Sequence, residues 1–182
     1  KNGTVKKTSL EEYTKTIRKT GISCLKLREG DILADATLVN DEDIVIVTKN
    51  GMGIRFKSSE VAASGRATIG IKGISLKEGD SVIKLVPIRD TTDDIAVFTI
   101  TGLGKRMSIS ELPAQKRSGK GVAIVKDAEL ADAIMVNDND MVLAVGVSNS
   151  ICISASEITK ATKNAVGTQI IKGTRLQGVS KV

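Results

Sequence analysis

A repeat of about fifty residues constrains this chain more strongly than any other feature of its sequence. A glutamate followed by a bulky apolar residue marks equivalent places in four aligned stretches, and successive copies are 48, 51 and 46 residues apart. The four pairs are Glu12-Tyr13, Glu60-Val61, Glu111-Leu112 and Glu157-Ile158. Since the residues around the pairs align, we divide the single 182-residue domain, 1–182, into four units: 1–40, 41–90, 91–137 and 138–182.

The first half of each unit has a pattern typical of a β-hairpin. Its first strand is a short apolar run, at 44–47, 95–98 and 141–145, which should be buried on both faces. In the first three units a glycine marks the turn, as in Asn50-Gly51, because the turn of a tight hairpin needs a positive φ. The second strand, for example 54–57, alternates apolar and cationic residues, so one face should be buried and the other exposed.

Two more strands are expected in each unit. A polar loop of roughly ten residues leads to a third strand, as at 71–76. A Gly-Asp turn then leads to a fourth strand, as at 32–38 and 81–86. Helical periodicity is absent almost throughout, and the stretch from Leu10 to Ile17 is the one ambiguous segment.

A four-stranded unit that recurs every ~40–50 residues is typical of propeller blades. One such sheet cannot bury its own apolar face, so neighbouring sheets must stack. A β-sandwich would not repeat its sequence, and a solenoid repeat would be shorter. We therefore predict an all-β, propeller-like array with about four blades visible. The first unit lacks its leading strand and no methionine opens the chain, so we expect a fragment of a longer protein.

Composition excludes several classes of function. With 41% hydrophobic and 26% charged residues the chain should fold, and no apolar run approaches the ~20 residues of a membrane helix. The absence of histidine removes the commonest general base and metal ligand, so we expect no catalytic residue, metal or cofactor. One tyrosine and two phenylalanines cannot form a base-stacking platform. Two cysteines without a motif favour a reducing, intracellular compartment.

The positive charge recurs at equivalent places in the repeat. A net charge of +6 favours a polyanionic partner. Because equivalent positions in a radial array lie at equivalent radius, the cations should form a curved stripe that matches the closely spaced phosphates of duplex DNA. The predicted DNA contacts are Lys6, Lys7, Arg18, Lys19, Arg55, Lys57, Arg66, Lys105, Arg106, Lys116, Arg117 and Lys120, with Lys160 and Lys163 in the fourth unit. The alternative is a protein-interaction propeller whose cations only maintain solubility.

The segment 115–121 is the most distinctive stretch of this basic pattern. It places three cations and two glycines in one loop, a composition that lets backbone amides and side chains approach phosphates together. The alternative is a flexible connector whose Gly121 only opens the third strand. The segment consists of Gln115, Lys116, Arg117, Ser118, Gly119, Lys120 and Gly121.

These sequences resemble the C-terminal domain of the A chain of DNA gyrase and, more loosely, that of its topoisomerase IV relative. The segment 115–121 is similar to the Q-R-R-G-G-[RK]-G box of that family, with lysine at 116 and 120 and serine at 118 as departures. The family carries its box in the first blade, whereas here the segment lies in the third unit. Other similar stretches are Asn2 to Thr8, Arg55-Phe56, Ser59 to Val61, Gly65 to Ile71 and Gly104 to Arg106.

The resemblance implies a six-bladed β-pinwheel whose blades exchange strands and whose basic outer rim wraps DNA. This domain would be non-catalytic and without cofactors, and would support ATP-dependent supercoiling by the whole topoisomerase. The implied partners are double-stranded DNA, the gyrase B subunit and the N-terminal strand-passage core of the same gyrase polypeptide, in the bacterial cytoplasm with no membrane contact. A topoisomerase IV domain is the near alternative, and the lack of histidine disfavours a propeller hydrolase.

Two further features are expected to be structural. Tyr13 aligns with Val61, Leu112 and Ile158, which predicts a buried position rather than a catalytic tyrosine. Three acidic clusters precede the first strands but lack the glycine and the terminal glutamate of a calcium-binding loop, so we expect them to form turns. The clusters are Asp41 to Asp43, Asp93-Asp94 and Asp138 to Asp140.

Overall fold

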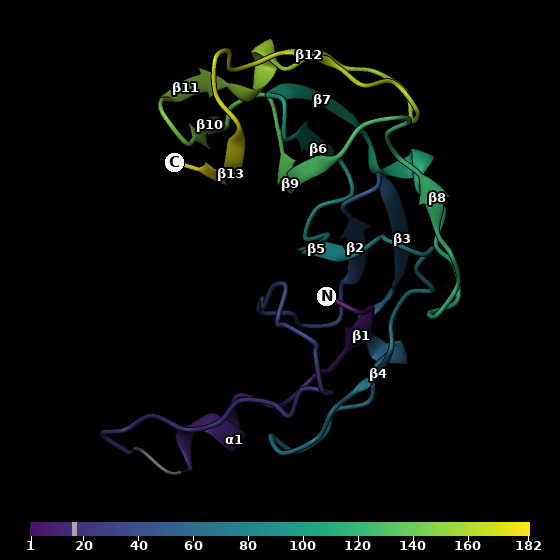
Figure 1. Cartoon of the computed structure of the whole chain (residues 1–182). Helices are drawn as coiled ribbons and strands as arrows, with labels where there is room; N and C mark the ends of the chain where they lie inside the picture. Colours follow the sequence, from purple (N-terminus) through teal and green to yellow (C-terminus); the bar gives the residue numbers. More distant parts are fainter. Residues whose placement is uncertain (16–17) are drawn as a thin grey trace.

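The computed structural model describes residues 1–15 and 18–182, and it confirms an all-β chain of small antiparallel sheets. The sheets stand side by side in an open arc around one axis (Figure 1). First strands are β2 (Asp43–Thr48), β6 (Asp94–Thr99) and β10 (Met141–Gly146). Second strands are β1 (Thr4–Val5), β3 (Met52–Lys57), β7 (Leu103–Ser108) and β11 (Ser150–Ser154). Third strands are β4 (Ile71–Lys72), β8 (Val122–Ala123) and β12 (Thr168–Gln169), and fourth strands are β5 (Val82–Pro87), β9 (Leu130–Val136) and β13 (Leu176–Lys181).

Three of the four described sheets combine strands of two units, because the third strand leaves its own unit. The strand orders are β5-β2-β3-β8 and β12-β7-β6-β9, so the outermost strand always comes from the following unit. In the same way β4 of unit 2 pairs with β1 of unit 1. The sheet of unit 4 contains β11, β10 and β13. The strand exchange implied by the resemblance is therefore present, and the exchanged strands lie on the convex side of the arc (Figure 1).

Several predicted elements differ in the structure. The segment 32–38, expected to be a fourth strand, has no regular structure, because fourth strands pair with first strands and the sequence of unit 1 has no first strand. The ambiguous segment forms only the short helix α1 (Glu11–Thr14), and its residues 16 and 17 lie outside the described residues. Three short 3₁₀ helices that the sequence did not predict follow the second strands: η1 (Ser58–Glu60), η2 (Ile109–Glu111) and η3 (Ala155–Glu157).

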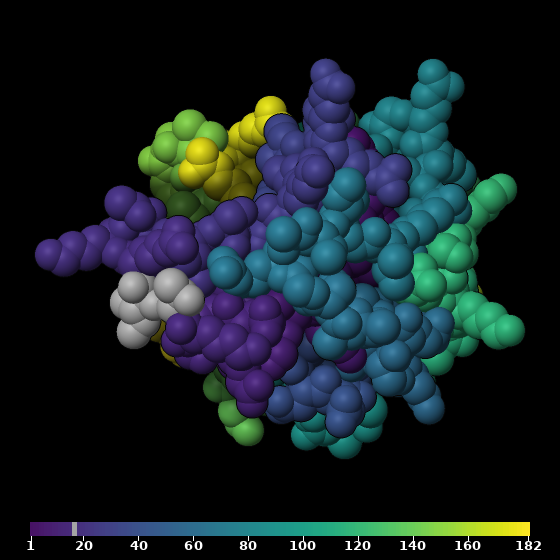
Figure 2. Space-filling model, turned by 90° about the horizontal axis from the view of Figure 1, so that it is seen from below, coloured from purple at the N-terminus to yellow at the C-terminus, as the bar shows by residue number. Residues whose placement is uncertain are grey.

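Tyr13 is half-buried, so the prediction that it is a buried position is wrong. It lies in α1, and its hydroxyl donates a hydrogen bond to the carbonyl of Cys24 over 3.1 Å. The aligned residue Val61 is only 3% exposed because it packs against the neighbouring sheet. Figure 2 shows the arc from below, where unit 1, in purple and blue, forms this end of the molecule together with the segment around β4.

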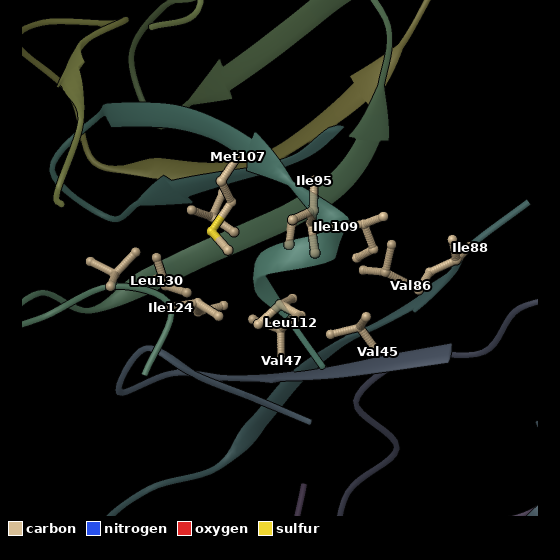
Figure 3. Close-up of a cluster of buried hydrophobic side chains, with 13 residues drawn as sticks. Val45, Val47, Val86, Ile88, Ile95, Met107, Ile109, Leu112, Ile124 and Leu130 are labelled. Carbon is tan, nitrogen blue, oxygen red and sulfur yellow. The ribbon is translucent and has the colours of Figure 1, made fainter. Parts of the chain in front are cut away.

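The apolar core is divided among the joints between successive sheets. Strand β2 is buried on both faces, as predicted: Val45 and Val47 face unit 3, whereas Ile44 and Ile46 face unit 1. Figure 3 shows the joint between units 2 and 3, where β2 and β5 pack against β6, β7 and η2. Adjacent sheets are therefore held face to face by buried aliphatic side chains. In the described part of the chain, no helix is long and apolar enough to cross a bilayer.

The hairpin glycine of units 1, 2 and 3 also joins each of these units to the next one by hydrogen bonds. Gly51 and Gly102 have φ of +77° and +83°, as the turn prediction requires. The carbonyl of Gly102 accepts hydrogen bonds from the amides of Ile170 (2.9 Å) and Ile171 (3.2 Å) in unit 4. A Cβ at Gly102 would lie 2.2 Å from the carbonyl oxygen of Ile171, so a side chain has no room there.

We expect Gly102→Ala to destabilise the fold more than a second glycine substitution with the same backbone requirement. Gly173 has φ of +71° but nothing within 4 Å of its Cβ position, so Gly173→Ala should cost only the left-handed conformation, about 1–2 kcal/mol. Gly102→Ala should cost a further ~1–3 kcal/mol from overpacking. Urea denaturation measures both losses, and equal losses would contradict the close approach.

Candidate nucleic-acid interface

At one position of the repeat, the predicted DNA-binding cations instead form hydrogen bonds between successive units. Lys7, Arg55 and Arg106 occupy equivalent positions, and each donates a hydrogen bond to a carbonyl at the 3₁₀ turn of the next unit. The bonds are Lys7 Nζ to Ser58 O (3.0 Å), Arg55 Nη1 to Ile109 O (3.3 Å) and Arg106 Nε to Ile158 O (3.0 Å). These side chains therefore join successive sheets by hydrogen bonds.

The acidic clusters neutralise the arginines at this position of the repeat. Asp43 Oδ2 lies 2.8 Å from Arg55 Nε, and Asp94 Oδ2 lies 3.5 Å from Arg106 Nη1. Arg106 also donates to Asp138, and this hydrogen bond, with the charge of the guanidinium, lowers the pKa of that carboxyl. Sequence reasoning missed these pairs. They could have been predicted, because units 2 and 3 both have an aspartate at the start of the first strand and an arginine in the second strand.

The preceding position of the repeat carries Lys6 in unit 1 and Lys105 in unit 3, and Lys105 is completely buried. Its Nζ donates to the carbonyls of Ile124 and Thr162, both at 2.7 Å, and the side chain is 0% exposed. Burial lowers the pKa of Lys105 to about 8, so the ammonium is still largely protonated at neutral pH. Lys6 makes the corresponding contacts in unit 1, with Cys24 O at 3.3 Å and Arg66 O at 2.9 Å.

These placements correct the prediction of one solvent-facing stripe. Lys105 and Arg106 are buried, and Lys6, Lys7 and Arg55 are half-buried with their charged ends bonded to protein atoms. The physical reason is the strand exchange, because the outer loop and the 3₁₀ turn of the following unit cover the face of the second strand that we expected to meet solvent. Exposed predicted cations are Arg18, Lys19, Lys57, Lys116, Lys120, Lys160 and Lys163.

The segment 115–121 is a loop of unit 3 that is fastened over unit 2. The amide of Gln115 donates to Arg55 O and the amide of Ser118 to Gly73 O, both at 2.8 Å. The Arg117 guanidinium donates to the carbonyl of Lys72. Because several of its amides are already bonded, the loop offers phosphates mainly its exposed lysines.

These contacts gather cations from two units on the convex side. Lys77 and Lys120 line one small hollow, and the carbonyl of Lys72 accepts the hydrogen bond from the Arg117 guanidinium. We define the loop patch as Lys72, Lys77, Lys116, Arg117 and Lys120. Arg66 takes the place of Arg117 in unit 2, where it is half-buried and donates to Ser23 O over 3.0 Å. In unit 4 that place belongs to the exposed Lys163.

Other cations face the concave side of the arc. A hollow of about 670 Å³ lies between the inner strands, and Lys49 and Arg175 are among its lining residues. Lys49 Nζ lies 2.9 Å from Glu129 Oε1. Lys49 and Arg175 line a different hollow from Lys77 and Lys120, so they provide a comparison with equal charge at another place.

We expect Lys105 to make stability depend on pH. Between its folded pKa of about 8 and its ordinary value of 10.5, the unfolded chain binds more protons than the folded chain, so the free energy of unfolding rises with pH. Lys105→Met removes this titration. Urea denaturation at pH 7 and pH 9.5 should show a gain in wild-type stability relative to the variant, and parallel pH profiles would contradict it.

Comparison with known proteins finds one family along most of the chain. The family "DNA gyrase C-terminal domain, beta-propeller" matches residues 1–40, 42–89 and 93–149. The DNA gyrase A protein of Deinococcus deserti is 35% identical over 181 residues, which covers 94% of this chain and 22% of that protein. The DNA gyrase A protein of Escherichia coli is 36% identical over 179 residues, covering 94% and 20%. The chain thus spans about a fifth of the length of these relatives.

Solved structures agree with this result over the whole arc. The C-terminal domain of a DNA topoisomerase IV superposes with a TM-score of 0.94 at 28% identity, covering 100% of this chain and 59% of that one. A DNA gyrase A C-terminal domain superposes with a TM-score of 0.88 at 26% identity, covering 99% and 62%.

Proposed function

The chain belongs to the DNA gyrase C-terminal domain family, and from this membership and its exposed outer lysines we propose that it is a non-catalytic domain that binds and bends DNA. The binding is independent of sequence, because lysines that contact phosphates carry no base code. The observation that supports this most directly is the loop patch, which collects cations of two adjacent units on the convex side of the arc.

The charge of the outer loops is available to an external anion. Within residues 1–15 and 18–182, Lys57, Lys116, Lys120 and Lys163 are exposed and take part in no ion pair. Lys160 differs, because its Nζ lies 3.1 Å from Asp94 Oδ2. Unpaired surface lysines can replace the counterions of a duplex, and the release of those counterions drives binding.

The arrangement of the sheets supports bending as well as binding. Successive outer loops follow the convex side of an arc, so a duplex that contacts several of them must curve (Figure 1). Bending 20–30 base pairs costs on the order of 1–6 kcal/mol, which several phosphate contacts offset. We therefore propose that DNA wraps along the outer loops of the units.

The partners follow from the same proposal. The domain works with a gyrase B subunit and beside the N-terminal strand-passage core of its own polypeptide, and it supports ATP-dependent supercoiling in the bacterial cytoplasm. Its own residues supply DNA contacts and no cofactor. The curated relatives, which are DNA gyrase A proteins, favour gyrase, whereas the TM-score of 0.94 favours the topoisomerase IV alternative. Supercoiling rather than decatenation by the full-length protein with its partner subunit distinguishes the two.

We expect Lys116→Gln with Lys120→Gln to weaken binding to a random-sequence duplex. Each lost phosphate contact should reduce the slope of log affinity against log salt concentration by about 0.9, so the double variant should lose up to about 1.8. Fluorescence anisotropy at several salt concentrations measures this slope. The change in fluorescence resonance energy transfer between dyes at the two duplex ends, when the protein is added, measures bending.

The matched control is Lys49→Gln with Arg175→Gln, which changes the net charge equally but on the concave side. Its slope should stay close to that of the wild type. If both double variants lose affinity equally, only the net charge matters and the loop patch is not the contact. If the wild type does not bind DNA even at low salt, the proposal fails and the protein-interaction alternative is favoured.

A further inference from the structure

A glutamate at the end of the 3₁₀ helix holds the basic loop of the next unit. In unit 2, Glu60 Oε2 accepts a hydrogen bond from the amide of Arg117 over 3.0 Å. In unit 3, Glu111 Oε2 accepts one from the amide of Lys163 over 2.8 Å. The two glutamates are equivalent in the repeat, and so are the two loop residues. The contact is therefore a repeated feature of the joints between units 2, 3 and 4.

The glutamate secures the part of the loop that carries the exposed lysines. The base of each loop is bridged to the preceding second strand, between Arg55 and Ala114 and between Arg106 and Lys160. Further along, the amides of Ser118 and its equivalent Asn164 donate to the carbonyl of the residue that directly follows the third strand of the preceding unit, Gly73 and Ile124 respectively. The residue that the glutamate binds lies between these two anchors.

Lys116 is the residue most directly affected in unit 3. Its two chain neighbours, Gln115 and Arg117, are both held through their amides, the first by Arg55 O and the second by Glu60. Without the glutamate, the backbone between Gln115 and Ser118 would lose its intermediate hydrogen bond, and only the Arg117 side chain would still be held, by the carbonyl of Lys72. In unit 4 the held residue is Lys163 itself, whose side chain remains exposed.

We propose that Glu60 and Glu111 are positioning residues, which order the basic loops so that Lys116, Lys120 and Lys163 face DNA. This inference rests on the proposed function of the outer loops. It assigns two acidic residues a supporting role in binding a polyanion, through a charge-assisted hydrogen bond to a loop amide.

The sign of the effect separates this role from simple electrostatics. A carboxylate beside a DNA-binding surface repels phosphates, so its removal should tighten binding if charge alone matters. If the carboxylate orders the loop, its removal frees the backbone, and DNA binding must then supply the entropy of ordering it. Glu60 is exposed, so its own charge is well screened and the ordering effect should dominate.

The repeat supplies a matched control at Glu157. This residue ends η3 as Glu60 ends η1, but its Oε1 accepts from the amide of Ser154 in its own unit, over 3.3 Å, and closes a capping box. Glu157→Ala therefore removes the same charge from the same register without touching a basic loop.

The experiment compares Glu60→Ala, Glu60→Gln and Glu157→Ala in the 182-residue chain. Binding to a random-sequence duplex is measured across salt concentrations, and amide hydrogen exchange of Arg117 is measured without DNA. We expect Glu60→Ala to accelerate exchange at Arg117 and to bind DNA about fivefold more weakly. Its salt slope should stay close to that of the wild type, because Lys116 and Lys120 still reach the phosphates once the loop is ordered. Glu60→Gln, which keeps an acceptor oxygen, should largely restore the exchange rate and the affinity, whereas Glu157→Ala should bind as tightly as the wild type or slightly more tightly.

Two results would overturn the positioning role. One is unchanged exchange at Arg117 in Glu60→Ala, which would show that the glutamate does not order the loop. The other is a gain in DNA affinity for Glu60→Ala equal to that for Glu157→Ala, which would show that only charge matters. A wild-type chain that does not bind DNA would instead defeat the proposed function, while the exchange measurement would still report the hydrogen bond from Arg117 to Glu60.

Discussion

The pairing of each third strand with the sheet of the preceding unit is the interaction on which this structure depends. Strands β4, β8 and β12 contribute only two residues each to the ladders, yet they carry the loops of their unit over the neighbouring sheet. The buried aliphatic faces hold adjacent sheets together, but the exchanged strand determines what covers the second strand from outside. The outer surface of every joint therefore contains residues of two units.

This covering divides the basic residues into two groups with different roles. Cations on the second strands meet carbonyls and carboxylates of the next unit and stabilise the joint, as Arg106 does with Ile158 and Asp94. Cations on the covering loops, such as Lys116 and Lys120, remain exposed. A single sequence pattern of lysine and arginine thus contains both joint-forming residues and the residues that we propose face DNA, and only the fold separates them.

Much of the architecture could be predicted from the sequence because the repeat fixes the positions of the first and second strands and of most fourth strands. The apolar runs, buried on both faces in β2 and β6, and the glycines at the hairpins were visible as patterns. The cover over the second strand was not, because it depends on which unit supplies the outer strand. One signal was available in the repeat. Lys105 aligns with Ile54, and an isoleucine at the equivalent position indicates that the position is buried, as both side chains are in the structure. The repeated glutamate served to align the units, but its contact with the next loop needed coordinates.

The interleaving of units also determines how the domain can fold as it is synthesised. The sheet that begins at Asp43 is complete only when Ala123 has joined it, so unit 2 cannot complete its four-stranded sheet alone, and the same holds for unit 3. At roughly 5–20 residues per second, the outer edge of β3 would wait several seconds on the ribosome for β8 to emerge. Assembly therefore trails translation by about one unit, and each nascent sheet spends that interval with an open edge that only the next unit closes.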